Sequence, residues 1–157
     1  TAADARKAVD SIYYGPRGKR GFANTQRAAG YGMLEVGEYL RRVNENLLFV
    51  GYCETREAVE NLDDILMVDG VDVVFMGPSD LSQAFGVIGQ VNHPLVQDTM
   101  DTVIAKTLRA GRVAGTVASD GNAAKALVAR GVRFIVMSSD HGMMAASARN
   151  MLAQFRS

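Results

Sequence analysis

Apolar and polar positions follow two patterns along the chain, one typical of buried strands and the other of amphipathic helices. Apolar runs predict four strands that are buried on both faces, at residues 47–54, 71–77, 113–119 and 133–139. Apolar residues that recur every three or four positions predict a helix after each run, at residues 55–68, 93–111, 122–131 and 141–155. Strands that alternate with helices in this way predict an α/β fold with a parallel sheet covered by helices.

The first part of the chain is less regular. Residues 1–13 have the apolar spacing of a helix, and Thr1 followed by Asp4 fits a capping box. Glycines and a proline break regular structure at residues 13–24, and a second helix is expected within residues 33–43. Because the chain starts at Thr1 rather than Met and its first residues already read as a helix, we expect it to be part of a larger protein.

Two architectures fit four strand–helix units in a row, an open doubly wound sheet and part of a (β/α)8 barrel. A complete barrel takes roughly 200 residues or more. A chain of 157 residues could therefore supply only part of one. In both architectures the functional sites lie at the carboxyl ends of the strands.

Composition and charge narrow the class of partner. A chain with 48% hydrophobic and 22% charged residues suits one globular domain spanning residues 1–157. Lys+Arg and Asp+Glu are equal at 17 each, so no electrostatic reason favours nucleic acid or an anionic membrane as partner. No apolar run approaches the roughly 20 residues that span a bilayer, and the start does not resemble a signal peptide. The single cysteine, Cys53, can form no internal disulfide, which is compatible with a reducing cytoplasm.

Each predicted strand ends near a carboxylate: Glu54, Asp80, Asp120 and Asp140. Capping of the following helix is the simple interpretation, and it fits Asp120 and Asp140 well because Asp is a favoured N-cap. It fits Asp80 less well, because Ser79 and Ser82 could cap that turn instead.

Glu54 fits a capping role worst. Glu is not a preferred N-cap, whereas Thr55 beside it is. A structural salt bridge from Glu54 to Arg56 or another arginine is the remaining structural alternative.

The functional interpretation is that Glu54 and Asp80, from adjacent strands, hold one divalent cation such as Mg²⁺ or Mn²⁺. Two carboxylates leave most of an octahedral shell open for water and a chelating α-keto acid. The Gly77-Pro78 turn opens into a helical turn, which points backbone N–H groups toward the same edge of the sheet and suits a carboxylate.

Three stretches together resemble the HpcH/HpaI aldolase family of metal-dependent class II pyruvate aldolases: "YYGPRGKRG", "ETREAVENLDDIL" and "GVDVVFMGPSDLS". The resemblance implies a (β/α)8 TIM barrel of which this chain is similar to the C-terminal half, strands 5–8 with their helices, with the N-terminal half absent. It implies an aldolase that cleaves 4-hydroxy-2-keto acids to pyruvate and an aldehyde, with the enolate stabilised by Mg²⁺, Mn²⁺ or Co²⁺.

The same resemblance assigns site residues. Glu54 and Asp80 would be the metal ligands, and Ser79 and Asp80, with the backbone of Gly77 and Pro78, would hold the carboxylate end of the keto acid. Tyr52 stands where the family usually has a glutamine that reaches toward the substrate. The family's catalytic histidine, its aspartate partner and its substrate-gripping arginine belong to the first half of the barrel, so the base is expected there.

The resemblance also implies a homo-oligomer in which neighbouring barrels exchange the C-terminal helix. In the family a residue of the seventh strand lines a neighbour's site, and that position here is Val117.

The remaining candidates have structural interpretations. His93 at a helix entrance is interpreted as a capping or surface residue, His141 as structural although it lies near a strand end, and Cys53 as a packing residue. The cations of residues 17–20 could bind an anion or belong to a structural loop.

Two alternatives to the aldolase stay open. One is a C–C lyase that acts on CoA thioesters, as the citrate-lyase-like relatives of the superfamily do. The other is a non-catalytic half-barrel that binds metal or keto acid, with an exposed sheet edge that seeks a partner.

Overall fold

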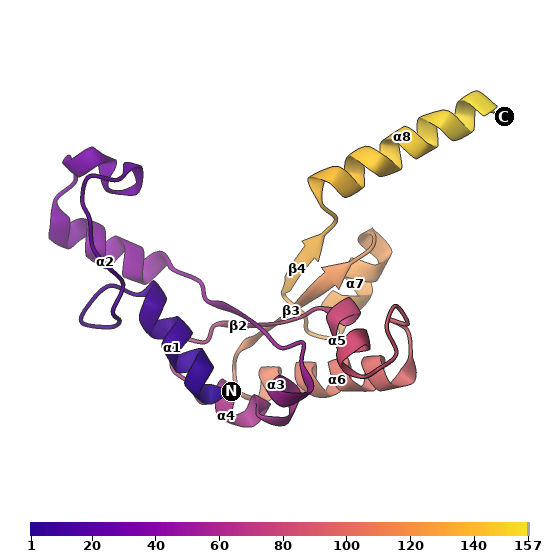
Figure 1. Ribbon diagram of the computed structural model, residues 1–157, viewed down its shortest axis with the longest axis horizontal. Helices are drawn as coiled ribbons and strands as arrows, with labels where there is room; N and C mark the ends of the chain where they lie inside the picture. The colour runs from indigo at the N-terminus through magenta and orange to yellow at the C-terminus, as the bar shows by residue number, and fades with distance from the viewer. Residues whose placement is uncertain (157) are drawn as a thin grey trace.

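A parallel four-stranded sheet organises the computed structural model, which describes residues 1–156 (Figure 1). The strands are β1 (Val50–Tyr52), β2 (Val73–Met76), β3 (Val113–Ala118) and β4 (Phe134–Met137), and they lie side by side in that order. All three pairings are parallel. The four predicted strands and their parallel arrangement are therefore confirmed, although each strand is shorter than its apolar run.

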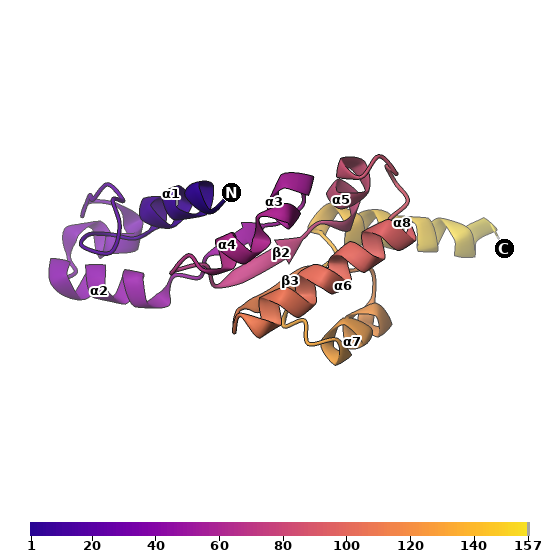
Figure 2. The ribbon, with the colours of Figure 1, turned by 90° about the horizontal axis from the view of Figure 1, so that it is seen from below.

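Helices connect the strands and cover one face of the sheet (Figures 1 and 2). Before the sheet come α1 (Ala2–Ile12), the 3-10 helix η1 (Arg27–Gly32) and α2 (Val36–Asn46). The later helices are α3 (Arg56–Glu60), α4 (Leu62–Leu66), α5 (Pro78–Ala84), α6 (Pro94–Arg109), α7 (Gly121–Ala129) and α8 (Asp140–Arg156).

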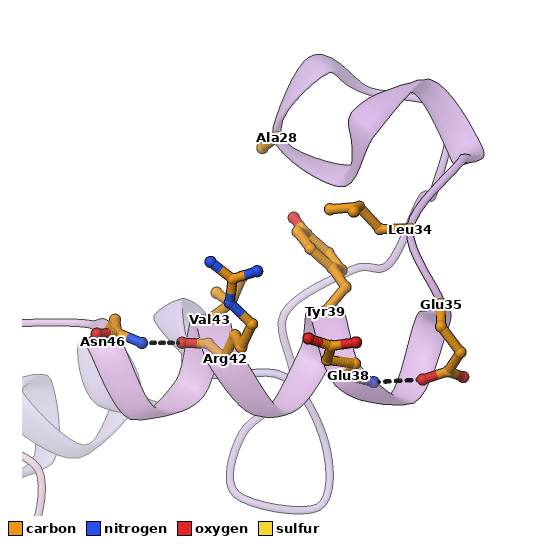
Figure 3. Close-up of a pocket in the computed structure, with 8 residues that line it drawn as sticks. All are labelled: Ala28, Leu34, Glu35, Glu38, Tyr39, Arg42, Val43 and Asn46. Atoms are coloured by element: carbon orange, nitrogen blue, oxygen red, sulfur yellow. Dashed lines mark hydrogen bonds between the residues drawn. The ribbon is translucent and has the colours of Figure 1, made fainter.

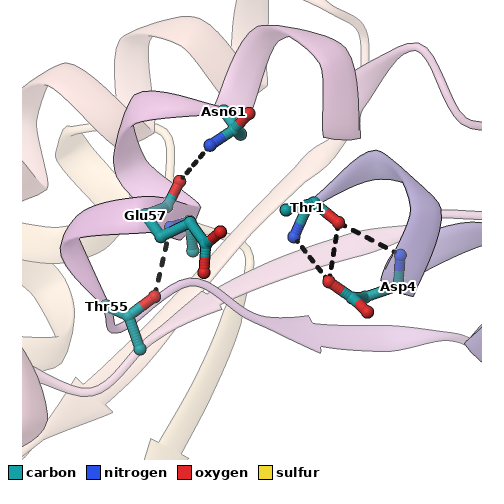
Figure 4. A network of polar contacts seen from close by, with 6 residues as sticks. Thr1, Asp4, Thr55, Glu57 and Asn61 are labelled. Atoms are coloured by element: carbon teal, nitrogen blue, oxygen red, sulfur yellow. Dashed lines mark hydrogen bonds and ion pairs between the residues drawn. The ribbon is translucent and has the colours of Figure 1, made fainter.

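The single helix predicted at residues 55–68 is wrong, because Asn61 divides it into α3 and α4. Asn61 has φ −93° and ψ 10°, outside the α-helical region. Its side-chain amide donates to the carbonyl of Glu57 at 2.8 Å, the same carbonyl that accepts from the backbone N–H of Asn61 at 3.0 Å (Figure 4). The apolar spacing continues across this break, so the pattern alone did not reveal it.

The second helix begins later than expected. Glu35 caps α2, and its carboxylate accepts from the backbone N–H groups of Gly37 at 2.8 Å and Glu38 at 2.6 Å. The preceding η1 was not predicted. It contains Gly30 and Tyr31 with φ of 60° and 55°, a left-handed conformation that Gly30 adopts without strain.

The core lies between the sheet and the helices of its covered face. All four residues of β2 are buried, which is the pattern of a central parallel strand. Val74 and Met76 of this strand pack with a cluster that includes Leu62 of α4, Leu81 of α5 and Val103 of α6. This packing places the carboxyl ends of β1 and β2 next to α5.

Local contacts fix the start of the chain. Thr1 and Asp4 form the predicted capping box, which Figure 4 shows beside α3. Asn44 of α2 accepts from the backbone N–H of Tyr14 at 2.9 Å and donates to its carbonyl at 3.0 Å. These contacts tie α2 to the end of α1.

The final helix, α8, leaves the sheet and extends away from the other helices (Figures 1 and 2). None of its described residues is buried, and the side chains of Met144 and Phe155 are 71% and 88% exposed. Among residues 1–156, no helix is both long and apolar enough to cross a bilayer.

Candidate functional site

The pairing of β1 with β2 brings Glu54 to the same edge of the sheet as Gly77. Tyr52 and Phe75 are register partners, and Glu54 and Gly77 each follow two residues later. The backbone N–H of Cys53 donates to the carbonyl of Phe75 at 2.8 Å, which extends the pairing beyond the strand ends. Because side chains alternate between the faces of a strand, Tyr52 and Glu54 share one face.

Both predicted metal ligands converge on Gly77. A Cβ atom at Gly77 would lie 2.8 Å from Glu54 Oε2 and 3.0 Å from Asp80 Oδ2. The two carboxylate oxygens therefore flank one point, and only a glycine leaves that point free. The structure brings together the two acids that the sequence singled out.

Burial and mutual repulsion act on this pair. The pKa of Glu54 is raised, first because the carboxylate is partly withdrawn from water and second because the negative charge of Asp80 lies nearby. Within residues 1–156 neither carboxylate makes a hydrogen bond or an ion pair. Two adjacent acids without a cation form a site that favours binding of a positive ion.

Helix α5 positions Asp80 through its first turn. Gly77 is the N-cap and makes no side-chain capping hydrogen bond, and Pro78 occupies the first helical position. The alternative that Ser79 or Ser82 caps this turn is therefore wrong. Ser82 is buried instead, donating to the carbonyl of Ser79 at 2.6 Å and accepting from the N–H of Gly89 at 3.0 Å.

The side chain of Ser79 is exposed beside Asp80. Pro78 and Val117 both line a hollow of about 330 Å³ between β3, α6 and α7.

Tyr52 precedes Glu54 by two residues, on the same face of the sheet, and is 65% exposed. Its ring packs against Phe75 at 5.1 Å between centroids, and Phe75 contacts Phe134 edge to face at 6.0 Å. Gly115 makes room for the second contact, since a Cβ there would lie 3.0 Å from Phe75. Sequence reasoning missed this aromatic layer, for which a glycine inside a predicted strand is the available signal.

The other strand-end acids have separate roles. Asp120 caps α7 as predicted, accepting from the N–H groups of Asn122 at 2.8 Å and Ala123 at 2.9 Å. The prediction that Asp140 caps the last helix is wrong, because Asp140 is the first residue of α8 and Ser139 Oγ accepts from the N–H of Gly142 at 3.2 Å.

Neither histidine has a hydrogen bond to Glu54 or Asp80. His93 caps α6 as expected, with Nδ1 accepting from the N–H of Leu95 at 3.2 Å. His141 is exposed, and its ring nitrogens lie 3.1 Å from Asp140 Oδ1 and 3.1 Å from Ser139 Oγ.

The residues next to Glu54 are accounted for by packing and capping. Thr55 caps α3 by accepting from the N–H of Ala58 at 3.1 Å. The alternative salt bridge from Glu54 to Arg56 is not formed, because Arg56 Nε donates to the carbonyl of Ala84. Cys53 is buried as predicted, and desolvation with a smaller effect of Glu54 raises the pKa of its thiol to about 11.

The cations of residues 17–20 make contacts within their loop and with the end of α1. Lys19 pairs with Asp10 at 2.7 Å. The guanidinium carbon of Arg17 lies 3.7 Å from the ring centroid of Tyr13, and that of Arg20 lies 4.7 Å from the ring centroid of Tyr14.

A groove of about 300 Å³ between η1 and α2 holds none of the predicted site residues (Figure 3). Tyr39, Arg42 and Glu38 line it, and it lies in the N-terminal segment rather than at the strand ends.

Among the described residues no group of three or more His, Cys, Asp and Glu side chains could hold a metal. In that part of the chain, Glu54 and Asp80 are thus a pair with no third side chain of these types beside them.

Comparison with known proteins places this geometry in context. Residues 1–147 match the model of the HpcH/HpaI aldolase/citrate lyase family. The chain is 37% identical over its whole length to a 2-keto-3-deoxy-L-rhamnonate aldolase of Escherichia coli strain K12, of which it covers 58%. The chain thus spans less than two thirds of the length of this curated relative.

Solved structures agree with the fold. An HpcH/HpaI aldolase/citrate lyase family protein from Burkholderia cenocepacia J2315 superposes on the whole chain with a TM-score of 0.91 at 33% identity, and the chain covers 62% of it. An HpcH/HpaI aldolase from Desulfitobacterium hafniense DCB-2 gives a TM-score of 0.90 at 29% identity, with 99% of this chain and 60% of that one covered. The fold is TIM-barrel-like, as in these aldolases.

Proposed function

The chain belongs to the HpcH/HpaI aldolase/citrate lyase family, and from this premise we propose that it carries the cation site of a divalent-metal-dependent aldolase. The complete protein would cleave 4-hydroxy-2-keto acids to pyruvate and an aldehyde. One observation carries the proposal: Glu54 Oε2 and Asp80 Oδ2 both lie within about 3 Å of the position that a Cβ of Gly77 would take. The name of the Escherichia coli relative supports the substrate class.

We further propose that the chain, residues 1–157, forms one unit that corresponds to strands 5–8 of a (β/α)8 barrel. Four parallel strands in chain order, with helices on one face, support this assignment. So does the coverage of 62% of a solved relative by the whole chain. In the described residues β1 and β4 each pair with one neighbour, which leaves two edges where further strands could close a barrel.

The carboxylate pair fits the metals on which this family generally depends. Carboxylate oxygens suit Mg²⁺, Mn²⁺ and Co²⁺, and two such ligands leave coordination positions for water and substrate oxygens. Glu54 and Asp80 would hold the ion. When bound, the ion would polarise the ketone of the substrate and stabilise negative charge as the C–C bond breaks.

The residues around Asp80 would orient the substrate. Ser79 presents its hydroxyl at the start of α5, and the backbone N–H groups of that first turn are not used by a side-chain cap. These donors, with the backbone of Gly77 and Pro78, would hold the carboxylate of the keto acid. Tyr52 would contact the substrate from the position two residues before Glu54.

A base must also remove the proton of the 4-hydroxyl group so that the aldehyde can leave. Neither histidine of this chain contacts Glu54 or Asp80, since His93 caps α6 and His141 contacts Asp140 and Ser139. We propose that the base belongs to a further part of the complete protein, the part that corresponds to the region of the relatives that this chain does not match.

We propose in addition that the protein is a homo-oligomer in which neighbouring copies exchange α8. No described residue of this helix is buried, yet it carries Met143, Met151 and Phe155. Exposed apolar side chains of this number favour burial against another chain.

Calorimetric titration of the chain with Mn²⁺ tests the site. We expect Glu54→Gln and Asp80→Asn each to weaken binding at least tenfold while circular dichroism shows an intact fold, because each removes one of two charged ligands. Unchanged affinity in both variants would refute the proposed site.

A complementation assay tests the reaction. The chain is co-expressed with the first part of the Escherichia coli relative, and pyruvate release from 4-hydroxy-2-keto acids is compared with cleavage of malyl-CoA and citramalyl-CoA. We expect pyruvate release that is lost with Glu54→Gln. Cleavage of the thioesters alone would identify a CoA-dependent lyase, and binding of Mn²⁺ without any turnover would favour a non-catalytic half-barrel.

A further inference from the structure

Arg56 makes its contacts with a distant part of the chain. It is the first residue of α3 and follows Glu54 by two positions. Its Nε donates to the carbonyl of Ala84 at 2.8 Å, and its guanidinium carbon lies 4.8 Å from the ring centroid of Phe85. One face of the guanidinium is thus used in stacking and one edge in a hydrogen bond.

Both partners of Arg56 belong to the end of α5. Ala84 is the last residue of this helix and Phe85 is its C-cap. The first turn of the same helix carries Asp80. A helix of seven residues is about 10 Å long, so a contact at one end restrains the orientation of the other.

The contact therefore joins the segment that carries Glu54 to the helix that carries Asp80. These two segments meet otherwise at Gly77, where the two negative side chains lie close together and repel one another. The repulsion favours a larger distance between the two carboxylates. The hydrogen bond from Arg56, at the start of α3, to Ala84, at the end of α5, opposes movement of the two helices away from each other. The guanidinium is committed to Ala84 and Phe85 and forms no ion pair with Glu54, so it leaves the charge of the two acids available for a cation.

We propose that Arg56 is a positioning residue of the cation site, which clamps α5 against the start of α3 and so sets the separation of the Glu54 and Asp80 carboxylates. This inference rests on the proposed function of those two residues. Lys cannot replace Arg56, because an ammonium group has no planar face for Phe85 and no Nε donor in the same place.

The clamp and a simple charge effect predict opposite results. Removal of a positive charge near a cation site strengthens cation binding by Coulomb's law. Removal of a clamp weakens binding, because the two ligands are no longer held at one separation. Residues that orient metal ligands typically change affinity about 10- to 100-fold when they are replaced.

The test is calorimetric titration of the full chain with Mn²⁺, with Arg56→Met, Arg56→Lys and Phe85→Leu compared with wild type. Phe85→Leu removes the stacking surface and leaves Arg56 itself unchanged. Arg109→Met is the matched control, because Arg109 is an exposed arginine in the last turn of α6. Thermal unfolding in EDTA measures the stability of each variant separately.

We expect about tenfold weaker Mn²⁺ binding in Arg56→Met and Arg56→Lys, weaker binding in Phe85→Leu, and wild-type affinity in Arg109→Met. Equal or tighter binding in Arg56→Met overturns the proposal, as does wild-type affinity in Arg56→Lys, because lysine lacks the planar group and the Nε donor on which the clamp depends. Glu54→Gln in the same series separates the two hypotheses. If it binds Mn²⁺ like wild type, the site itself is wrong, whereas loss of binding in Glu54→Gln with none in Arg56→Met rejects only the clamp.

Discussion

Replacement of Gly77 by alanine places one methyl group at the point on which the two acids converge. The methyl carbon would lie 2.8 Å from Glu54 Oε2 and 3.0 Å from Asp80 Oδ2. Both distances are below an ordinary van der Waals contact. Gly77 has φ −96° and ψ 103°, which alanine adopts without strain, so the steric effect is confined to these two oxygens.

The expected cost falls on cation binding rather than on folding. In the metal-free chain both carboxylates can rotate away from the methyl group, so the free energy of unfolding should change by less than about 1 kcal/mol. To bind a cation, Glu54 Oε2 and Asp80 Oδ2 must both return to their positions beside residue 77, where they contact the methyl group. Overpacking of this kind costs about 1–3 kcal/mol, which corresponds to Mn²⁺ affinity that is roughly 5- to 150-fold lower.

Calorimetric titration with Mn²⁺ and urea unfolding in EDTA measure the two effects separately. Gly121→Ala is the control, because Gly121 also lies at the start of a helix and a Cβ there meets nothing within 4 Å. Wild-type Mn²⁺ affinity in Gly77→Ala would refute the reasoning, since a cation could then not lie between these oxygens. A loss of affinity of the same size in Gly121→Ala would also refute it.

Two further predictions concern the metal-free chain. Because the pKa of Glu54 is raised above its ordinary value of 4.5, protonation of Glu54 stabilises the fold below pH 4.5, and this stabilisation is lost as the pH rises through the raised pKa. Glu54→Gln should therefore increase the urea-derived free energy of unfolding at pH 7 and increase it much less at pH 4. An equal increase at both pH values would contradict the assigned cause. Asp120→Ala should lower that free energy by about 1 kcal/mol through loss of the α7 cap, whereas the exposed Asp98→Ala should change it by less than about 0.5 kcal/mol.

The strands and most of the caps could be predicted from local sequence. A central parallel strand must be apolar on both faces, so the run that contains β2 is recognisable on its own. A cap is recognisable because its partners lie two or three residues away, as for Thr55 and Asp120. The break at Asn61 was missed, because the apolar spacing of a helix continues across it.

By itself the sequence determined the four strand–helix units, the acids that follow the strands and, through the motifs around them, the family. Only the tertiary structure decided which acids meet, because parallel pairing of β1 with β2 and the position of α5 direct Glu54 and Asp80 toward Gly77. It likewise decided that Arg56 contacts α5 rather than Glu54, and that no described residue of α8 is buried. These outcomes depend on contacts between segments far apart in the chain, whose energies a local pattern of apolar and polar residues does not contain.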